Sequence, residues 1–90
     1  MSVKVRVSSL LRKFTDGQEV VEVTGHSATE CLHNLEVQFP SIRQWLYDKQ
    51  GKLLPPVQFY VNGERILVDE LNNPLEDDAE ILILLAIGGG

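Results

Sequence analysis

Apolar and polar residues alternate at the start of the chain, where basic side chains separate Val3, Val5 and Val7. A period of two is typical of a strand with one buried face. A second β-branched segment covers residues 19–23, and the Asp-Gly pair at 16–17 predicts a turn before it. The pattern therefore predicts an N-terminal β-hairpin.

The spacing of apolar residues then changes to that of a helix. One helical face would collect Ala28, Cys31, Leu32, Leu35 and Phe39. Ser27 and Glu30 fit a capping box, in which Ser27 caps the helix and Glu30 reaches back to it. Pro40 predicts that the helix ends at or before Phe39. A short second helical turn is predicted by Ile42, Trp45 and Leu46.

The second half of the chain predicts three more strands. Residues 57–61 form a β-rich run, and Asn62-Gly63 after them is a strong hairpin signal, because a type I′ turn needs positive φ at both central residues. Residues 66–68 are expected to return as a short edge strand. An acidic loop over 69–80 precedes an Ile- and Leu-rich strand over 81–86. The predicted order is β-β-α-β-β-β in one domain.

Alternation also predicts which strand residues leave the core. If Phe59, Ile81 and Ile83 face the helix, the opposite face carries Arg6, Gln58, Tyr60, Leu82, Leu84 and Ala86. One helix covers only one face of a sheet, so an exposed apolar patch is expected there, which is typical of a partner site. The alternative is that both faces of the last strand are covered within the chain. The expected partner interface consists of Tyr60, Leu82, Leu84, Ala86 and Ile87.

Composition limits the class of protein. Ninety residues with 43% hydrophobic and 23% charged residues suit one small domain, without room for a deep enzyme pocket and a lid. No apolar run reaches the roughly 18 residues of a membrane helix, and Lys4 and Arg6 argue against a signal peptide. A single cysteine, Cys31, cannot form an internal disulfide, which fits a cytoplasmic location. The net charge of −5 disfavours nucleic-acid binding and suits a basic protein partner.

The remaining side chains suggest structural roles. Cys31 on the apolar helix face is expected to pack as a small hydrophobic residue, and Trp45 is expected in the core, as are the loop residues Leu10, Leu11 and Phe14. His26 and His33 lack the spacing of a metal site, and the acidic loop lacks that of a calcium loop, so no metal is expected. We expect the acidic loop to steer a basic partner.

Residues 88–90 are three consecutive glycines. Glycine loses more conformational freedom on ordering than any other residue, so the folded domain gains nothing from this segment. Extended, three residues span about 10 Å, enough to carry a terminal carboxylate into a narrow channel. A frayed terminus or a cloning remnant is the alternative. We expect a domain over residues 1–87, a flexible glycine tail over 88–90, and a reactive carboxylate on Gly90.

Several stretches of the chain resemble one family of small ubiquitin-like proteins. They are Leu11-Arg12 followed by Thr15-x-Gly17, Asn34-Leu35-Glu36 leading to Phe39-Pro40, Tyr60-Val61-Asn62-Gly63, and Ala86-Ile87-Gly88-Gly89-Gly90. The family is that of the ThiS/MoaD sulfur carriers, and the likeness is greatest to carriers that serve cysteine and other amino-acid biosynthesis. The resemblance covers essentially the whole chain. Asp77-Asp78 departs from it, since the family often has Gly-Asp in the turn before the last strand.

The resemblance implies an α+β fold, the ubiquitin-like β-grasp. Its mixed sheet has one main helix crossing one face and, here, a short second helical turn. A right-handed helical crossover connects parallel strands, which places the last strand beside the first in the middle of the sheet.

The resemblance also implies a reaction. An activating enzyme of the MoeB/ThiF type would adenylate Gly90 with ATP, and sulfide or a persulfide would displace AMP. The resulting thiocarboxylate, at the tip of the Gly88-Gly89 tail, would deliver sulfur to a biosynthetic enzyme. The chain would be a protein cosubstrate without a bound cofactor, not an enzyme.

Two other classes of function stay open. In a protein modifier, a lysine would attack the adenylated glycine and form an isopeptide bond. In a ubiquitin-like interaction domain, the tail would have no chemical role. The approach Leu85-Ala86-Ile87 resembles the carriers more than the eukaryotic modifiers, in which this segment is more basic.

Overall fold

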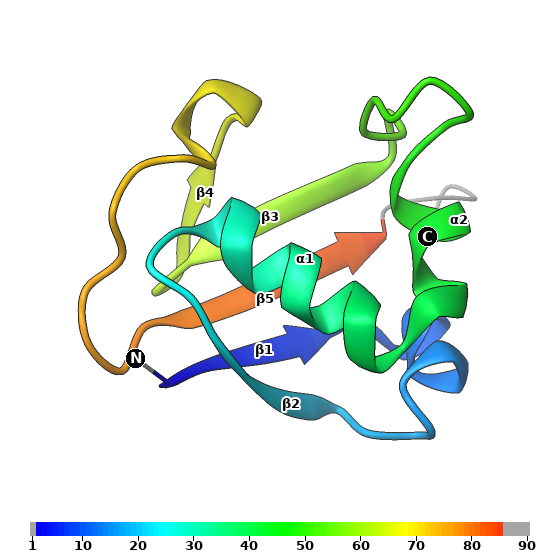
Figure 1. The fold of residues 1–90 in the computed structure, drawn as a ribbon, viewed down its shortest axis with the longest axis horizontal. Coiled ribbons are helices and arrows are strands. Elements are labelled where there is room, and N and C mark those ends of the chain that lie inside the picture. The colour runs from blue at the N-terminus through cyan, green and yellow to red at the C-terminus, as the bar shows by residue number, and fades with distance from the viewer. Residues whose placement is uncertain (1, 86–90) are drawn as a thin grey trace.

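The computed structural model describes residues 2–85 of the chain. They form a five-stranded sheet with its strands in the order β2-β1-β5-β3-β4 (Figure 1). The strands are β1 (Ser2–Val7), β2 (Val20–Thr24), β3 (Val57–Val61), β4 (Glu64–Ile66) and β5 (Glu80–Leu85). β5 runs parallel to β1 and antiparallel to β3, so the last strand lies in the middle of a mixed sheet.

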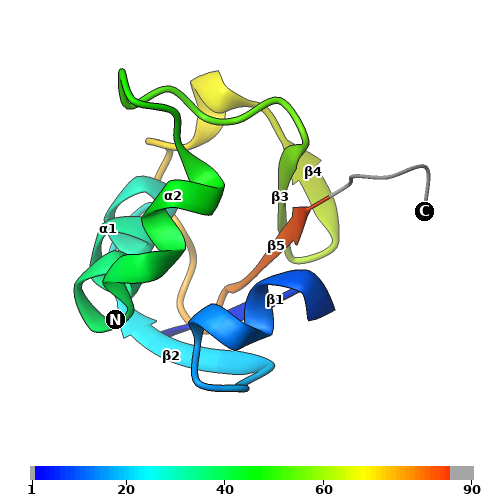
Figure 2. The same cartoon turned by 90° about the vertical axis from the view of Figure 1, so that its right-hand side faces the viewer.

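Helices cover one face of this sheet. They are α1 (Ala28–Gln38) and α2 (Arg43–Leu46). The described residues also form the 3-10 helices η1 (Ser9–Phe14), η2 (Pro40–Ile42) and η3 (Val68–Glu70). α1 crosses the sheet, and α2 lies on the same side of it (Figure 2). This arrangement is the β-grasp. It confirms the predicted fold class and the central place of the last strand.

The core lies between the sheet and the helices. β1, β2 and β5 bury alternate side chains, and α1 buries the apolar face that its spacing predicts. The larger side chains with no appreciable exposure are Val3, Val5, Val7, Leu11, Leu32, Leu35, Ile42, Leu46, Ile81 and Ile83. Each large aliphatic side chain that is fully buried contributes about 1.5–3 kcal/mol, so this layer is the main source of stability.

The start of α1 differs from the predicted capping box in one bond. Ser27 Oγ accepts the amide of Glu30 over 3.2 Å, as expected of an N-cap. The Glu30 carboxylate, however, accepts the amide of His26 over 2.8 Å and not that of Ser27. Ser27 forms an isolated bridge with Pro74, which holds this segment extended and brings the preceding amide to Glu30.

Four turns of the described residues use the left-handed backbone region, one of them at Gly51 with φ of 83°. Asn62 and Gly63 have φ of 50° and 86°, as the predicted type I′ hairpin requires. Asp16 has φ of 55°, next to Gly17. Asp78 has φ of 61°, so an aspartate adopts here a conformation that glycine adopts more easily.

Two predictions about the core are wrong. Trp45 is 38% exposed, because the inner side of this short segment is taken by Ile42 at the end of η2 and Leu46 at the end of α2. Leu10 is 50% exposed, whereas Leu11 beside it is fully buried. Only one of these two adjacent side chains can point inward from η1.

The predicted edge strand over 66–68 is also misplaced. A two-residue turn sets the register directly, so Glu64 pairs with Val61 and Ile66 with Phe59. β4 therefore ends at Ile66, and the chain then enters η3. The last strand is described as far as Leu85; the predictions for Ala86, for the domain limit at 87 and for the tail over 88–90 lie outside the described residues.

Candidate functional site at the end of the central strand

The carboxyl end of β5 is held from both sides. Ile83 lies opposite Val7 of β1, and Leu85 lies opposite Val57 of β3. Ile83 is fully buried and Leu85 is nearly so. The last residue that the structure describes is therefore anchored in the core.

Ser8 supplies the last hydrogen bond on the β1 side. Its N–H donates to the carbonyl of Ile83 over 3.0 Å, and in a regular parallel ladder its own carbonyl would accept the N–H of Leu85. That carbonyl instead accepts the N–H of Leu11 over 2.9 Å, because the chain turns into η1. The hydroxyl replaces it: the Leu85 N–H donates to Ser8 Oγ over 3.2 Å.

Sequence reasoning missed this residue. A serine between a strand and a helix predicts an N-cap whose hydroxyl accepts an amide two or three residues later. Ser8 does stand at the N-cap of η1, but its side chain makes no capping bond there. Its partner comes from the far end of the chain.

Ser8→Ala is expected to loosen Leu85 without unfolding the domain. A lost hydrogen bond of this kind costs about 1 kcal/mol, which corresponds to about fivefold faster exchange of the Leu85 amide. Amide exchange followed by NMR measures this directly. Ser9→Ala is the matched control, and equal exchange rates in the two variants would show that Ser8 does not hold Leu85.

The loop that follows Ser8 is stabilised by its own hydrogen bonds. The Arg12 carbonyl accepts the amides of Thr15 and Gly17 over 3.0 and 2.7 Å. The Arg12 side chain pairs with Glu19 over 3.2 Å. Thr15 is fully buried. The Leu11-Arg12…Thr15-x-Gly17 pattern thus forms a compact loop beside the end of β5.

Asn62 holds the opposite end of β5. Its backbone N–H donates to the Glu80 carbonyl over 2.9 Å, and its side-chain Oδ1 accepts the backbone N–H of Glu80 over 3.0 Å. The Tyr60-Val61-Asn62-Gly63 stretch therefore combines a hairpin turn with a clamp on the first residue of the central strand.

Three residues of the predicted interface, Tyr60, Leu82 and Leu84, alternate with the buried positions and so lie on the face of the sheet away from the helices, which Figure 2 shows edge-on. Tyr60 lies opposite Leu82, and Gln58 lies opposite Leu84, across the pair β3–β5. On the β1 side, Arg6 lies opposite Leu82. We call Tyr60, Leu82 and Leu84 the open-face patch.

The burial of β5 follows the predicted alternation. Leu82 and Leu84 are partly buried, whereas the odd-numbered residues of the strand are buried. The assignment of inward and outward side chains is therefore correct for β5. The role of this patch in docking stays a prediction, and Ala86 and Ile87 of the predicted interface lie outside the described residues.

Cys31 is a core residue. Its side chain is fully buried on α1, and burial, followed by the charge of Glu30, raises the pKa of the thiol. The thiolate, which is the nucleophilic form, is therefore disfavoured. This environment matches the predicted structural role of Cys31.

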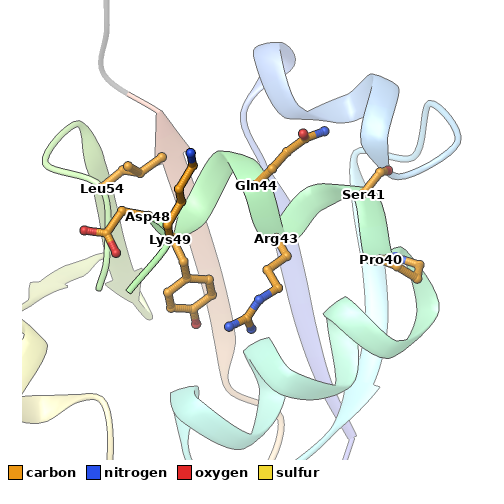
Figure 3. Close-up of a pocket in the computed structure, with 8 residues that line it drawn as sticks. Pro40, Ser41, Arg43, Gln44, Asp48, Lys49 and Leu54 are labelled. Carbon is orange, nitrogen blue, oxygen red and sulfur yellow. The ribbon is translucent and has the colours of Figure 1, made fainter. Parts of the chain in front are cut away.

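A hollow of about 680 Å³ lies beside α2 (Figure 3). It is lined by Pro40, Ser41, Arg43, Gln44, Tyr47, Asp48, Lys49 and Leu54. Arg43 already pairs with Glu36 over 2.7 Å and lies 5.1 Å from the ring of Tyr47. The Asp48 carboxylate accepts the amides of Gln50 and Lys52 in its own turn, so Arg43 and Asp48 both make contacts within the fold.

Residues 2–85 offer neither a membrane-spanning helix nor a cluster of metal ligands. None of their helices combines the length and the apolar character needed to cross a membrane. Within the same residues, His, Cys, Asp and Glu side chains do not gather in groups of three that could hold a metal ion. His26 and His33 are both exposed.

Known proteins resemble this chain over its full length. The sulfur carrier protein CysO of Mycobacterium tuberculosis is 32% identical over 93 residues, and the alignment covers 100% of both chains. A chain in the crystal structure of the Amycolatopsis orientalis BexX/CysO complex is 29% identical, with a TM-score of 0.85. There the match covers 98% of this chain and 99% of that chain.

A second solved structure shares the fold alone. The small archaeal modifier protein 1 of H. volcanii is 16% identical, with a TM-score of 0.84 and coverage of 96% of this chain and 98% of that chain. The ThiS family itself matches residues 5–90. The match spans nearly the whole chain, and the chain therefore belongs to the ThiS/MoaD family of ubiquitin-like sulfur carriers.

Proposed function

We propose that this protein carries sulfur as a thiocarboxylate on Gly90 and delivers it to a biosynthetic enzyme. The observation that carries the proposal is family membership over residues 5–90, which include the terminal glycines. The anchored end of β5 supports it, because Ser8 and Val57 hold the chain five residues before Gly90. The CysO relative suggests a role in the synthesis of cysteine.

The proposed reaction has two steps. The Gly90 carboxylate attacks ATP at the α-phosphorus in an activating enzyme of the MoeB/ThiF type, and pyrophosphate leaves. Hydrosulfide then attacks the carbonyl carbon of the acyl-adenylate, the bond to the AMP oxygen breaks, and AMP leaves with that oxygen. Loss of the sulfur proton gives the thiocarboxylate. ATP is a substrate of the activating enzyme, and we propose no cofactor bound to this chain.

The contribution of this chain is positioning. Proteins of this kind are generally not catalysts, and the only cysteine here is buried with a raised pKa. Once the domain has docked beside the active site of the activating enzyme, the carboxylate reacts from within the complex and does not have to find the active site by a separate bimolecular encounter. We propose that the open-face patch makes this docking contact and that the reaction takes place in the cytoplasm, where thiols stay reduced.

The mass of the intact protein tests the proposal. With the activating enzyme, ATP and sulfide, the chain is expected to gain the mass difference between sulfur and oxygen, and fragmentation should place it at Gly90. Without ATP the mass should not change. Cys31→Ser should behave as the wild type, because the reaction does not use this thiol.

Three other results would each contradict the carrier function. Sulfur on Cys31 with an unchanged C-terminal carboxylate would indicate a persulfide-bearing domain. An isopeptide bond to a lysine, with no thiocarboxylate intermediate, would indicate a modifier. An activity that survives deletion of Gly89 and Gly90 would indicate an interaction domain.

A further inference from the structure

Several elements meet at the end of the domain from which β5 leaves the sheet. β1 and β5 are parallel, so both end at this edge, and η1 follows β1 directly. Figure 2 faces this end and shows η1 next to the end of β1, and α2 on the helix side of the sheet, across the core from the end of β5. Phe14 of η1 and Trp45 of α2 join the two helices, with their ring centroids 5.2 Å apart.

Lys13 lies over these two rings. Its ammonium nitrogen is 5.4 Å from the ring centroid of Phe14 and 6.0 Å from that of Trp45. Aromatic rings attract a cation without neutralising it. We call Lys13, Phe14 and Trp45 the aromatic corner. Trp45 on α2 is 38% exposed, and Leu10 on η1 is 50% exposed.

The positive charge of the corner is available to a partner. Arg6, Arg12 and Arg43 each pair with a carboxylate, and these three account for the salt bridges among residues 2–85. Lys13 is thus a cation held on an apolar surface. A partner that covers the rings would also meet an ammonium group, so an acidic side chain there would gain a close, partly desolvated ion pair.

The charge of the whole domain is unevenly distributed. Segments 8–19 and 39–57, which build the end with the aromatic corner, carry five basic and three acidic side chains. The rest of the chain carries three basic and ten acidic side chains. One of these ten, Glu36, is paired with Arg43 of this end over 2.7 Å.

The acidic loop lies at the other end of β5. Six of the thirteen acidic residues fall within 69–80, the segment that leads into Glu80 at the start of the strand (Figure 1). Five residue steps of β-strand separate Glu80 from Leu85, about 17 Å. A basic partner steered to this loop would therefore approach the wrong end of the domain, whereas an acidic partner is steered to the end with the corner.

We propose that the aromatic corner docks on the activating enzyme, against a surface with an apolar centre and an acidic rim beside the place where the tail enters. This inference rests on the proposed function, which makes that enzyme the partner that receives residues 86–90. Those five residues span at most about 18 Å, so an enzyme that holds Gly90 must lie against this end of the domain. Trp45 and Phe14 supply apolar contact area. Lys13 attracts the acidic rim during approach and fixes the orientation of the domain on the enzyme.

A charge series at Lys13 tests the proposal. Lys13→Gln and Lys13→Glu are expected to lower the association rate with the activating enzyme stepwise, with about a tenfold loss for Lys13→Glu at low salt. Raising the ionic strength to about 0.5 M should remove most of the difference, because exposed charges are then screened. Stopped-flow mixing measures the association rate, and intact mass measures the rate of sulfur gain.

Lys4→Glu is the matched control. It makes the same change in net charge on β1, opposite Glu22 and Glu80 and far from the corner. The proposal predicts that Lys4→Glu slows association much less than Lys13→Glu does. If both variants slow association equally, the effect comes from net charge alone and not from the position of Lys13. If Lys13→Glu does not slow association, or speeds it, the partner surface is not acidic. Each of these results overturns the inference.

Trp45→Ala tests the apolar part independently. It is expected to raise the dissociation rate at all salt concentrations, since the lost contact is not ionic. If Trp45→Ala fails to fold, the Lys13 variants still test whether the aromatic corner docks on the enzyme. A wild-type chain that gains no sulfur would refute the proposed function and this inference together, whereas a modified wild type with an equally reactive Lys13→Glu would refute this inference alone.

Discussion

Deletion of Gly89 and Gly90 is expected to abolish the gain of sulfur, with a rate at least about 100-fold below that of the wild type. The deletion withdraws the terminal carboxylate by about 7 Å, farther than a reacting group can be displaced without losing contact with its target. The assay is intact mass after incubation with the activating enzyme, ATP and sulfide. The melting temperature should not change, because the last described strand ends at Leu85.

Gly90→Ala distinguishes the effect of the tail's length on the reaction from the effect of its width. The variant keeps the reach of the wild type and adds one methyl group, so a narrow channel should slow the reaction without abolishing it. A truncated chain that acquires sulfur at Gly88 as fast as the wild type does at Gly90 would disprove the proposed role of the terminal residues.

Ile83→Glu is expected to unfold the domain. Ile83 is fully buried between Val7 and Phe59, its partners on both sides of the sheet. An unpaired carboxylate at such a site costs several kcal/mol, a large part of the 5–15 kcal/mol that typically stabilises a small domain. Circular dichroism and urea denaturation would show a lost transition.

Leu84→Glu, one residue further along β5, is the matched control with the opposite outcome. Its side chain is partly buried on the face away from the helices, so the variant should fold. It should weaken binding to the activating enzyme by about 1–3 kcal/mol, the value of burying one such side chain. A Leu84→Glu chain that folds and binds as tightly as the wild type would exclude the open-face patch as a docking surface.

The features predicted correctly from the sequence have local signals. The hairpin at Asn62-Gly63 depends on the backbone preferences of two adjacent residues. The inward and outward side chains of β5 follow from the two-residue period of a strand, which a few consecutive residues are enough to show. The ends of α1 follow from Ser27 and Pro40. The family likeness then supplied the strand order, which local patterns leave open.

The features that were missed depend on segments far apart in the chain. Ser8 and Leu85 are 77 residues apart, so no local pattern could indicate that this hydroxyl leaves its own helix for the last strand. Trp45 is a large apolar residue of the kind usually found in a core, but Ile42 and Leu46 take the inner positions of its segment, and its ring packs instead against Phe14 of η1. The sequence shows the acidic loop over 69–80, but only the structure shows that it lies at the end of β5 opposite Leu85.

The central place of β5 also determines how the domain bears a mechanical load. Any enzyme that draws residues 86–90 inward pulls along the axis of β5, which is hydrogen-bonded to β1 on one side and β3 on the other. Such a force acts in shear on the hydrogen bonds of both strand pairs at the same time. Peeling an edge strand would instead break its hydrogen bonds one after another. The β-grasp can therefore be held by its last few residues and pulled from a partner without losing its last strand.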